Sequence, residues 1–165
     1  MTPGYVAVTI GNSARTRNNT GSIWVATYAP ASESDHSTDG SKYVRTVLLA
    51  TNTFGNGSSN DKTDLVADPV SGNVYAAWSD FHGSGCNEIL FSRSTDSGAT
   101  FSAPLKLSSG ICGNQAPSIA IGPAGQVNVA WFANNGGAFG KTPGSINYAA
   151  FTTSTDGGKT FSLAR

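Results

Sequence analysis

The chain has 165 residues, of which 12% are charged and 38% are hydrophobic, and its ten basic residues balance ten acidic ones. This length allows one domain with a sizeable core, and the recurring aromatic and β-branched residues argue against disorder. The balanced charge gives no indication of a nucleic acid or an anionic membrane surface as partner, and no apolar run is long enough to span a bilayer.

Three stretches in the first third of the chain are predicted to be strands, at 5–10, 22–28 and 43–50. Each is rich in β-branched and aromatic residues, and polar or glycine-containing segments separate them. The segment 31–41 is predicted to be a solvated loop. Residues 21–27 align with 72–78, so we expect this part of the chain to be a first copy of a repeat that recurs further on.

Two further groups of four strands are predicted after residue 60. The second group comprises 64–68, 74–78, 88–93 and 101–107, and the third comprises 117–121, 126–131, 145–152 and 162–165. Trp78 and Trp131 occupy matching strands and lie 53 residues apart. Two aromatic side chains at equivalent strand positions indicate core between packed sheets.

The clearest repeat is the motif Ser-Thr-Asp-x-Gly-x-Thr-Phe, which occurs at 94–101 (motif 1) and at 154–161 (motif 2). No copy is recognised in the first unit. An aspartate can accept hydrogen bonds from nearby backbone N–H groups, and glycine supplies the positive φ that a tight turn needs. We therefore predict a hairpin turn that is stabilised by its own side chains. The residues assigned to this structural role are Ser94, Asp96, Gly98, Thr100 and Phe101, and Ser154, Asp156, Gly158, Thr160 and Phe161.

This motif resembles the Asp-box of the sialidase (BNR-repeat) superfamily, in which it joins the third and fourth strands of β-propeller blades. The resemblance implies an all-β fold of about three four-stranded blades, at about 4–58, 60–110 and 114–165. It identifies architecture better than activity, because Asp-boxes occur in enzymes and non-enzymes of the superfamily.

Three blades cannot close a ring, since an open array leaves strand edges and apolar faces exposed. The superfamily closes with six blades. The chain is therefore expected to be a piece of a longer propeller, or to pair with a second copy, or to stack into a larger assembly. A compact three-bladed monomer is the least expected outcome.

The two cysteines, Cys86 and Cys112, lie in glycine-rich loops and form no Cys-x-x-Cys pair, so a zinc site is not expected. Buried free thiols are the alternative to a disulfide, but loop residues flanked by glycine make poor core. We expect a disulfide, which implies an oxidising compartment and a secreted or surface-displayed protein.

Few residues of this chain match the catalytic residues that the sialidase resemblance implies. The superfamily uses an arginine cluster, a Tyr–Glu pair and an acid/base aspartate, and no arginine motif of that kind is present in the chain. The nearest candidates are Glu88, Asp80 (which with His82 could form an acid/base pair) and Arg93. For each, an ordinary structural role is the competing interpretation: a loop collects polar residues, and Arg93 could simply face solvent.

Ligand sites are weakly indicated. Asp61-Lys62-Thr63-Asp64 could offer oxygens to calcium but lacks the alternation of a dedicated loop, and neither a metal nor a cofactor is predicted. Several aromatic residues could stack on sugars or could belong to the core: Tyr5, Tyr28, Tyr75, Tyr148, Trp24, Trp78 and Trp131. The sequence therefore favours a non-catalytic binding or structural module, with other blades and carbohydrate as partners. The alternative is a piece of a sialidase-type glycoside hydrolase.

Overall fold

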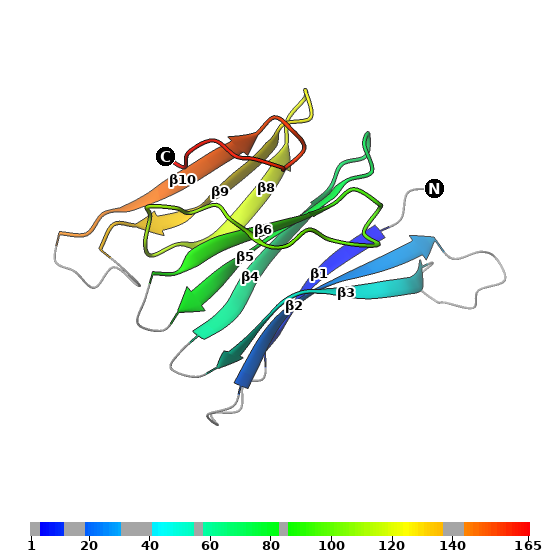
Figure 1. The fold of residues 1–165 in the computed structure, drawn as a ribbon, viewed down its shortest axis with the longest axis horizontal. Coiled ribbons are helices and arrows are strands. Elements are labelled where there is room, and N and C mark those ends of the chain that lie inside the picture. The colour runs from blue at the N-terminus through cyan, green and yellow to red at the C-terminus, as the bar shows by residue number, and fades with distance from the viewer. Residues whose placement is uncertain (1–3, 12–18, 31–40, 55–57, 83–85, 137–143) are drawn as a thin grey trace.

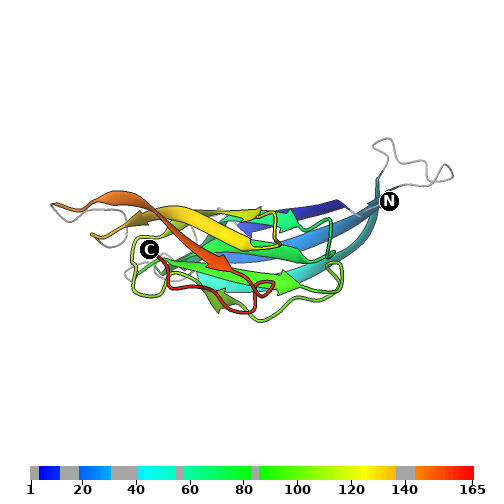
Figure 2. The ribbon, with the colours of Figure 1, turned by 90° about the horizontal axis from the view of Figure 1, so that it is seen from above.

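The computed structural model describes residues 4–11, 19–30, 41–54, 58–82, 86–136 and 144–165. The described residues form no helix, and hence none that could cross a membrane. They form three antiparallel sheets that lie side by side without closing on one another, with sheet 2 between sheets 1 and 3 (Figures 1 and 2). The all-β, incomplete propeller predicted from the sequence is therefore confirmed.

The strands follow the chain in order. Sheet 1 consists of β1 (Gly4–Gly11), β2 (Asn19–Pro30) and β3 (Ser41–Phe54). Sheet 2 consists of β4 (Ser58–Ala67), β5 (Val74–His82), β6 (Glu88–Ser94) and β7 (Leu105–Lys106). Sheet 3 consists of β8 (Gln115–Ile121), β9 (Val127–Asn134) and β10 (Asn147–Ser154).

The fourth strands are shorter than the sequence predicts. In sheet 2 the predicted strand 101–107 is reduced to β7, where Leu107 N–H also donates to the carbonyl of Ile89 (2.8 Å). In sheet 3 the segment after motif 2 is not a regular strand, but Phe151 and Arg165 exchange two backbone hydrogen bonds (2.9 and 3.2 Å). The chain therefore runs along the outer edge of both sheets with only partial pairing.

The direction of β2 contradicts the alignment of 21–27 with 72–78. That alignment requires β2 to run in the same direction as β5. Only three residues separate the end of β3 from the start of β4, so these two ends lie together. The side-chain amide of Asn60 donates to the carbonyl of Gly21 (3.3 Å), which brings the start of β2 to the same place. Because β5 is antiparallel to β4, β2 is antiparallel to β5. In order and direction, β1, β2 and β3 thus correspond to the second, third and fourth strands of sheet 2.

The revised correspondence of the strands also changes where a copy of the motif is to be expected in the first unit. By this correspondence β2 and β3 match the pair of strands that motif 1 joins in sheet 2. The whole connection between β2 and β3, 31–40, lies outside the described residues, but the sequence 37–43 reads Ser-Thr-Asp-Gly-Ser-Lys-Tyr, which is the motif shortened by one residue. Asp39 precedes Asp96 by 57 residues, close to the 60 that separate Asp96 from Asp156. Because 37–43 is one residue shorter than the motif, it does not match the eight-residue pattern.

The main core lies between sheets 2 and 3. One face of sheet 2, with Tyr75, Ile89 and Phe91, packs against the face of β9 that carries Val129 and Trp131. The other face of sheet 2 is also buried, and Trp78 on that face is fully covered. Side chains therefore alternate along β5 between two interfaces, as a sheet enclosed by two others requires.

Phe91 of sheet 2 packs closely against sheet 3. Its ring stacks on Tyr75 (6.0 Å between centroids) and meets Phe161 edge-on (4.9 Å). We expect Phe91→Ala to lower the free energy of unfolding by about 3–5 kcal/mol, because it leaves a cavity between two sheets. Urea denaturation measures this change. Val70→Ala, at a fully exposed turn position, is the control and should have little effect; equal destabilisation by both variants would contradict this packing.

Candidate functional site

Motifs 1 and 2 form the same hydrogen-bonded turn. In motif 1 the Ser94 hydroxyl donates to Asp96 Oδ1 (2.7 Å) and accepts from Gly98 N–H (2.8 Å). Asp96 also accepts from the N–H (2.9 Å) and hydroxyl (2.6 Å) of Thr100. In motif 2 Ser154, Asp156, Gly158 and Thr160 repeat these contacts, with every distance within 0.1 Å of its counterpart. The carboxylates are thus engaged within their own turns.

These contacts change the acidity of both aspartates. The Thr100 hydroxyl, the Thr100 N–H and the Ser94 hydroxyl hold the pKa of Asp96 well below its usual value. Thr160 and Ser154 lower the pKa of Asp156 in the same way. A hydrogen bond to the charged form of a carboxyl group favours that form. Both side chains are therefore ionised acceptors over a wide pH range and are unsuited to donating a proton near neutral pH.

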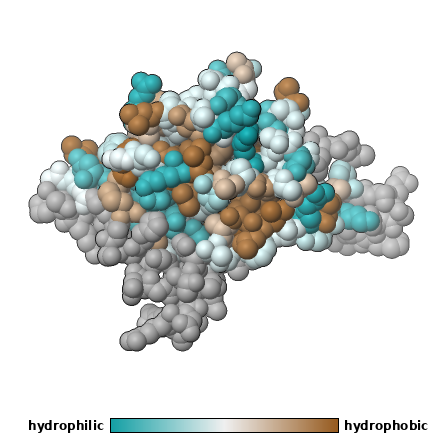
Figure 3. Space-filling view, in the orientation of Figure 1, coloured by the Kyte–Doolittle hydropathy of each residue, from teal (hydrophilic) through white to brown (hydrophobic). Residues whose placement is uncertain are grey.

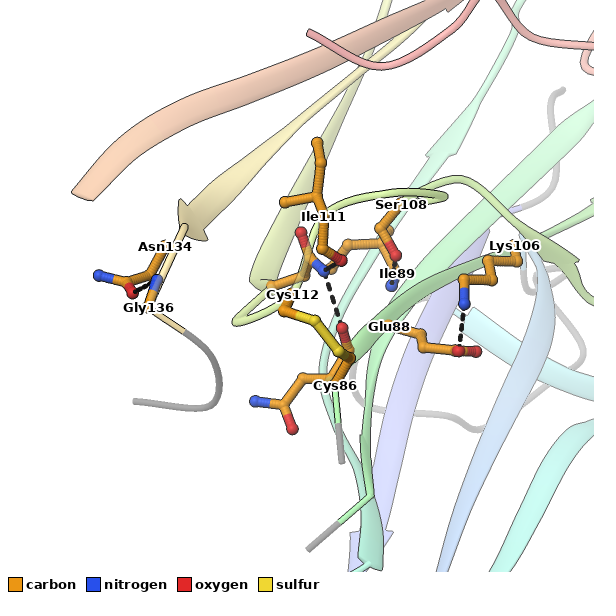
Figure 4. The surroundings of a disulfide bond; sticks show 11 residues. Cys86, Glu88, Ile89, Lys106, Ser108, Ile111, Cys112, Asn134 and Gly136 are labelled. Carbon is orange, nitrogen blue, oxygen red and sulfur yellow. Dashed lines mark hydrogen bonds and ion pairs between the residues drawn. A yellow bond between two sulfur atoms is a disulfide. The ribbon is translucent and has the colours of Figure 1, made fainter. Parts of the chain in front are cut away.

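The opposite end of sheets 2 and 3, which we call the disulfide end, holds the bond between Cys86 and Cys112 (Figure 4). The predicted disulfide is therefore present. It joins the connection between β5 and β6 to the one between β7 and β8. A disulfide is consistent with an oxidising compartment.

Asn114 organises this end, and the sequence analysis did not single it out. Its fully buried side chain donates to the carbonyls of Asn87 (2.7 Å) and Ile111 (2.6 Å). Its Oδ1 accepts from the indole N–H of Trp131 (2.7 Å). One amide thus ties the disulfide-linked loops to the core of sheet 3. The signal that could have found it is an amide residue two positions after Cys112, in a glycine-containing loop three residues before an expected strand.

Two of the three candidate catalytic residues lie side by side at the disulfide end. Asp80 and Glu88 are paired residues on β5 and β6, so their side chains share a face of sheet 2. Glu88 forms a salt bridge with Lys106 of β7 (Figure 4), and its side chain is 24% exposed. Asp80 is 8% exposed and has interactions of its own. The side chain of His82, its proposed partner, lies outside the described residues.

Arg93, the third candidate, is far from the other two. It lies five residues beyond Glu88 on β6, which is roughly 16 Å along a strand. Its guanidinium donates to the carbonyl of Gly157 in motif 2 (3.0 Å). Arg93 therefore links sheets 2 and 3 at the end that carries motifs 1 and 2, which we call the motif end, rather than facing solvent or joining the carboxylates.

The two aspartates that could offer oxygens to calcium, Asp61 and Asp64, accept hydrogen bonds from backbone N–H groups. Asp64 accepts from the backbone N–H groups of Leu65 (2.9 Å) and Ile119 (2.7 Å), and the second bond joins β4 to β8. Asp61 Oδ1 accepts from Lys62 N–H (2.7 Å). Within the part of the chain that the structure describes, no three His, Cys, Asp or Glu residues are grouped so that they could hold a metal ion.

The aromatic candidates divide between core and surface. Tyr75, Trp78 and Trp131 are buried, so they are unable to stack on a sugar. Trp24 and Tyr28 are half-buried, Tyr148 is exposed, and the side chain of Tyr5 lies outside the described residues. Any aromatic platform for carbohydrate would have to come from the sheet surfaces rather than from the matching tryptophans of β5 and β9.

Known structures resemble the chain in fold. A structure titled Hadza microbial sialidase Hz136 is similar over 95% of this chain, with a TM-score of 0.54 and 13% sequence identity. An α-L-arabinofuranosidase from Fusarium graminearum, solved as its E242A mutant with an iminosugar inhibitor, is similar over 94%, with a TM-score of 0.49 and 13% identity. No protein-family profile and no curated protein sequence matches the chain.

The likeness to the sialidase structure defines a class of fold. The chain has a sialidase-like propeller fold, built from three sheets. It spans 36% of the length of the sialidase chain and 46% of that of the arabinofuranosidase. At 13% identity these likenesses concern the fold alone, because one fold carries many activities.

The disulfide closes a segment of 26 residues, so its removal is predicted to destabilise the protein by about 3 kcal/mol through the entropy of the unfolded chain. Urea denaturation of the Cys86→Ser/Cys112→Ser double variant measures this loss. Thiol titration of the denatured, unreduced wild type should find no free thiol. Two free thiols, or an unchanged denaturation midpoint, would contradict the assignment.

The lowered pKa of Asp96 and Asp156 predicts acid sensitivity. A carboxyl group whose folded pKa lies below its unfolded value of about 3.9 contributes stability above that value, and this stability is lost as the pH falls further. The unfolding midpoint should therefore decrease as the pH is lowered below about 4. The decrease should be shallower in the Asp96→Asn/Asp156→Asn variant; identical pH profiles would show that the turns do not titrate. Both turns are exposed, so solvent screening limits the effect.

Proposed function

We propose that this chain is a non-catalytic Asp-box propeller module of a secreted or surface protein, which serves binding or structural assembly. The observation that carries the proposal is the position of Arg93, whose guanidinium is bound to Gly157 at the end of the sheets opposite to Glu88. The sequence resemblance calls for arginines that converge on a substrate carboxylate. Of the other described arginines, Arg165 lies over the Phe151 ring and Arg45 is exposed on β3.

The two motifs support the structural part of this proposal. Their aspartates hold their own turns, and Gly157 and Gly158 of motif 2 lie against side chains of sheet 2. Such a turn strengthens the connection between sheets and leaves the opposite ends of the strands available for binding. Other sheets of the same kind are the partners that this architecture favours, and carbohydrate is the ligand class that the resemblance suggests.

The alternative is a piece of a sialidase-type glycoside hydrolase, and one observation favours it. Asp80 and Glu88 lie side by side on one face of β5 and β6, and a carboxylic acid is the acid/base group that the sialidase resemblance calls for. Glu88 also forms a salt bridge with Lys106, and Asp80 is the more buried of the two carboxylates. The structural likeness to a sialidase is compatible with this alternative as well as with the main proposal.

A fluorogenic sialoside assay on the longest available form of the protein tests the choice. The main proposal predicts no turnover above the buffer rate, and no change in Asp80→Asn or Glu88→Gln. Turnover that falls at least about 100-fold in either variant would establish the alternative, since acid–base groups contribute on this order. Asp68→Asn at the motif end is the matched control, because Asp68 is engaged with Ser71 and Val70 in its own turn.

A further inference from the structure

A cleft separates two hairpin turns at the motif end, where sheets 2 and 3 lie against each other. One wall is the turn between β4 and β5, residues 68–73, and the other is the turn between β8 and β9, residues 122–126 (Figure 1). Tyr75 of β5 and Gly157 of motif 2 also line the cleft. Its volume of about 600 Å³ lies in the range of sites for small molecules.

The two walls of the cleft are largely apolar. Each turn carries a proline at its second position, Pro69 on one wall and Pro123 on the other, and Val70 and Ile121 extend these walls. In Figure 3 the upper edge of the molecule, where both turns lie, carries hydrophobic and hydrophilic residues side by side. Apolar walls with a few placed polar groups are the usual composition of a ligand site.

Two polar side chains in the cleft have hydrogen-bonding capacity that the chain does not use. The phenol oxygen of Tyr75, a residue that is 1% exposed, accepts from Asn73 Nδ2 (3.1 Å). The phenol hydrogen then finds no acceptor among the described residues, and Asn73 Oδ1 finds no donor among them. Leaving a buried donor unpaired costs free energy. The cleft therefore has a place for a group that accepts from Tyr75 and donates to Asn73.

A single hydroxyl group meets both requirements, because its oxygen accepts and its hydrogen donates. Tyr75 and Asn73 are hydrogen-bonded to each other, so one ligand hydroxyl can lie close to both side chains. A peptide group, in contrast, has its donor and its acceptor on different atoms that point in opposite directions. A water molecule would also satisfy both side chains, but it would leave most of the cleft volume unused.

The glycine at position 157 keeps these polar atoms accessible. A Cβ atom added to Gly157 would lie 3.8 Å from Asn73 Nδ2 and 3.9 Å from the hydroxyl oxygen of Tyr75. The counterpart of Gly157 in motif 1 is Ser97, whose φ of +56° is close to the +70° of Gly157. The turn thus accepts a serine at this position. The side chain that motif 1 carries is missing where it would fill the cleft.

The charges around the cleft favour a neutral ligand. Among the described residues that line it, Asp68 alone is charged, and its oxygens accept from the Val70 N–H (2.9 Å) and the Ser71 hydroxyl (2.6 Å). An anion would lie near this carboxylate, and like charges repel. No second acidic residue lines the described cleft to help hold a cation. Arg93 donates to the Gly157 carbonyl and is not a lining residue.

We infer that this cleft binds one neutral sugar ring. A ring hydroxyl accepts from Tyr75 and donates to Asn73, and the C–H groups of the ring lie against the two proline-containing walls. The site is a second place for binding, beyond the strand ends that the proposed function leaves available. Both of its walls belong to sheets that pack on each other within the described chain, so its shape is set without any further sheet.

Nuclear magnetic resonance titration of the ¹⁵N-labelled protein tests the inference, with the methyl glycosides of glucose, galactose and mannose as probes. The expected result is a saturable shift of the amide signals of the two turns and of Gly157 with at least one probe. Tyr75→Phe keeps the ring that packs on Phe91 and should raise the dissociation constant at least about 10-fold. Tyr148→Phe, at an exposed position at the disulfide end of β10, is the matched control and should bind as the wild type does. No shift with any of the three probes, or equal affinity in Tyr75→Phe, would overturn the inference.

A glycine pair tests the shape of the cleft. Gly157→Ser introduces the residue of motif 1 and should weaken binding at least about 10-fold, because it fills the space beside the phenol. Gly110→Ser is its control, since Gly110 also has a positive φ (+81°) and a Cβ atom added there meets nothing within 4 Å. Unchanged binding by Gly157→Ser in a protein that circular dichroism shows to be folded would contradict the site.

An anionic probe tests the charge argument. Methyl β-glucuronide should bind more weakly than methyl β-glucoside, because its carboxylate would lie near that of Asp68. Tighter binding of the glucuronide would contradict a site for a neutral sugar. None of these measurements depends on glycosidase activity or on the disulfide end, so the inference and the proposed function can fail separately.

Discussion

The close approach of motif 2 to sheet 2 is the contact on which the arrangement of the two sheets depends. A Cβ atom added to Gly158, which has φ of +78°, would come within 3.0 Å of the Phe91 ring. The glycine is therefore required both by the backbone conformation and by the neighbouring side chain. The same motif supplies Phe161 to Phe91 and the Gly157 carbonyl to Arg93. The turn thus serves as a spacer that sets how closely one sheet packs on the next.

The polar groups at the two interfaces of sheet 2 differ in how completely they are hydrogen-bonded. Between sheets 2 and 3, the indole N–H of Trp131 has Asn114 as its acceptor, and the N–H groups of Ile119 and Ala116 bond to Asp64 and Ser79 across the gap. On the side of sheet 1, Trp78 Nε1, Thr27 Oγ1 and Asn60 Oδ1 are buried without a hydrogen-bond partner among the residues that the structure describes. Buried polar atoms without partners cost free energy. The described polar groups between sheets 2 and 3 are therefore more completely hydrogen-bonded than those between sheets 1 and 2.

The sequence was sufficient for the fold class and for the first three strands of sheets 2 and 3, because both units carry a tryptophan on the second strand and the motif at the end of the third. It misplaced the frame of sheet 1, since short apolar runs such as 21–27 match many strands equally well, and strand direction depends on contacts such as that of Asn60 with Gly21. The candidate site was predicted only in part. Asp80 and Glu88 do lie together, whereas the bond of Arg93 to a carbonyl 64 residues away is invisible in a linear pattern.

The difference between the two repeat spacings, 53 residues for the tryptophans and 60 for the aspartates, has a single origin. Five residues connect β5 to β6, whereas twelve connect β9 to β10, and both connections lie at the disulfide end. The strand pairings on either side have accommodated seven additional residues, because all signals that specify the turn lie at the other end of the strands. The fold therefore separates the part of its sequence that must stay fixed from the part that can change in length. Loop grafting at the β9–β10 connection should accordingly be tolerated, which makes that end the natural place to diversify or engineer binding on this scaffold.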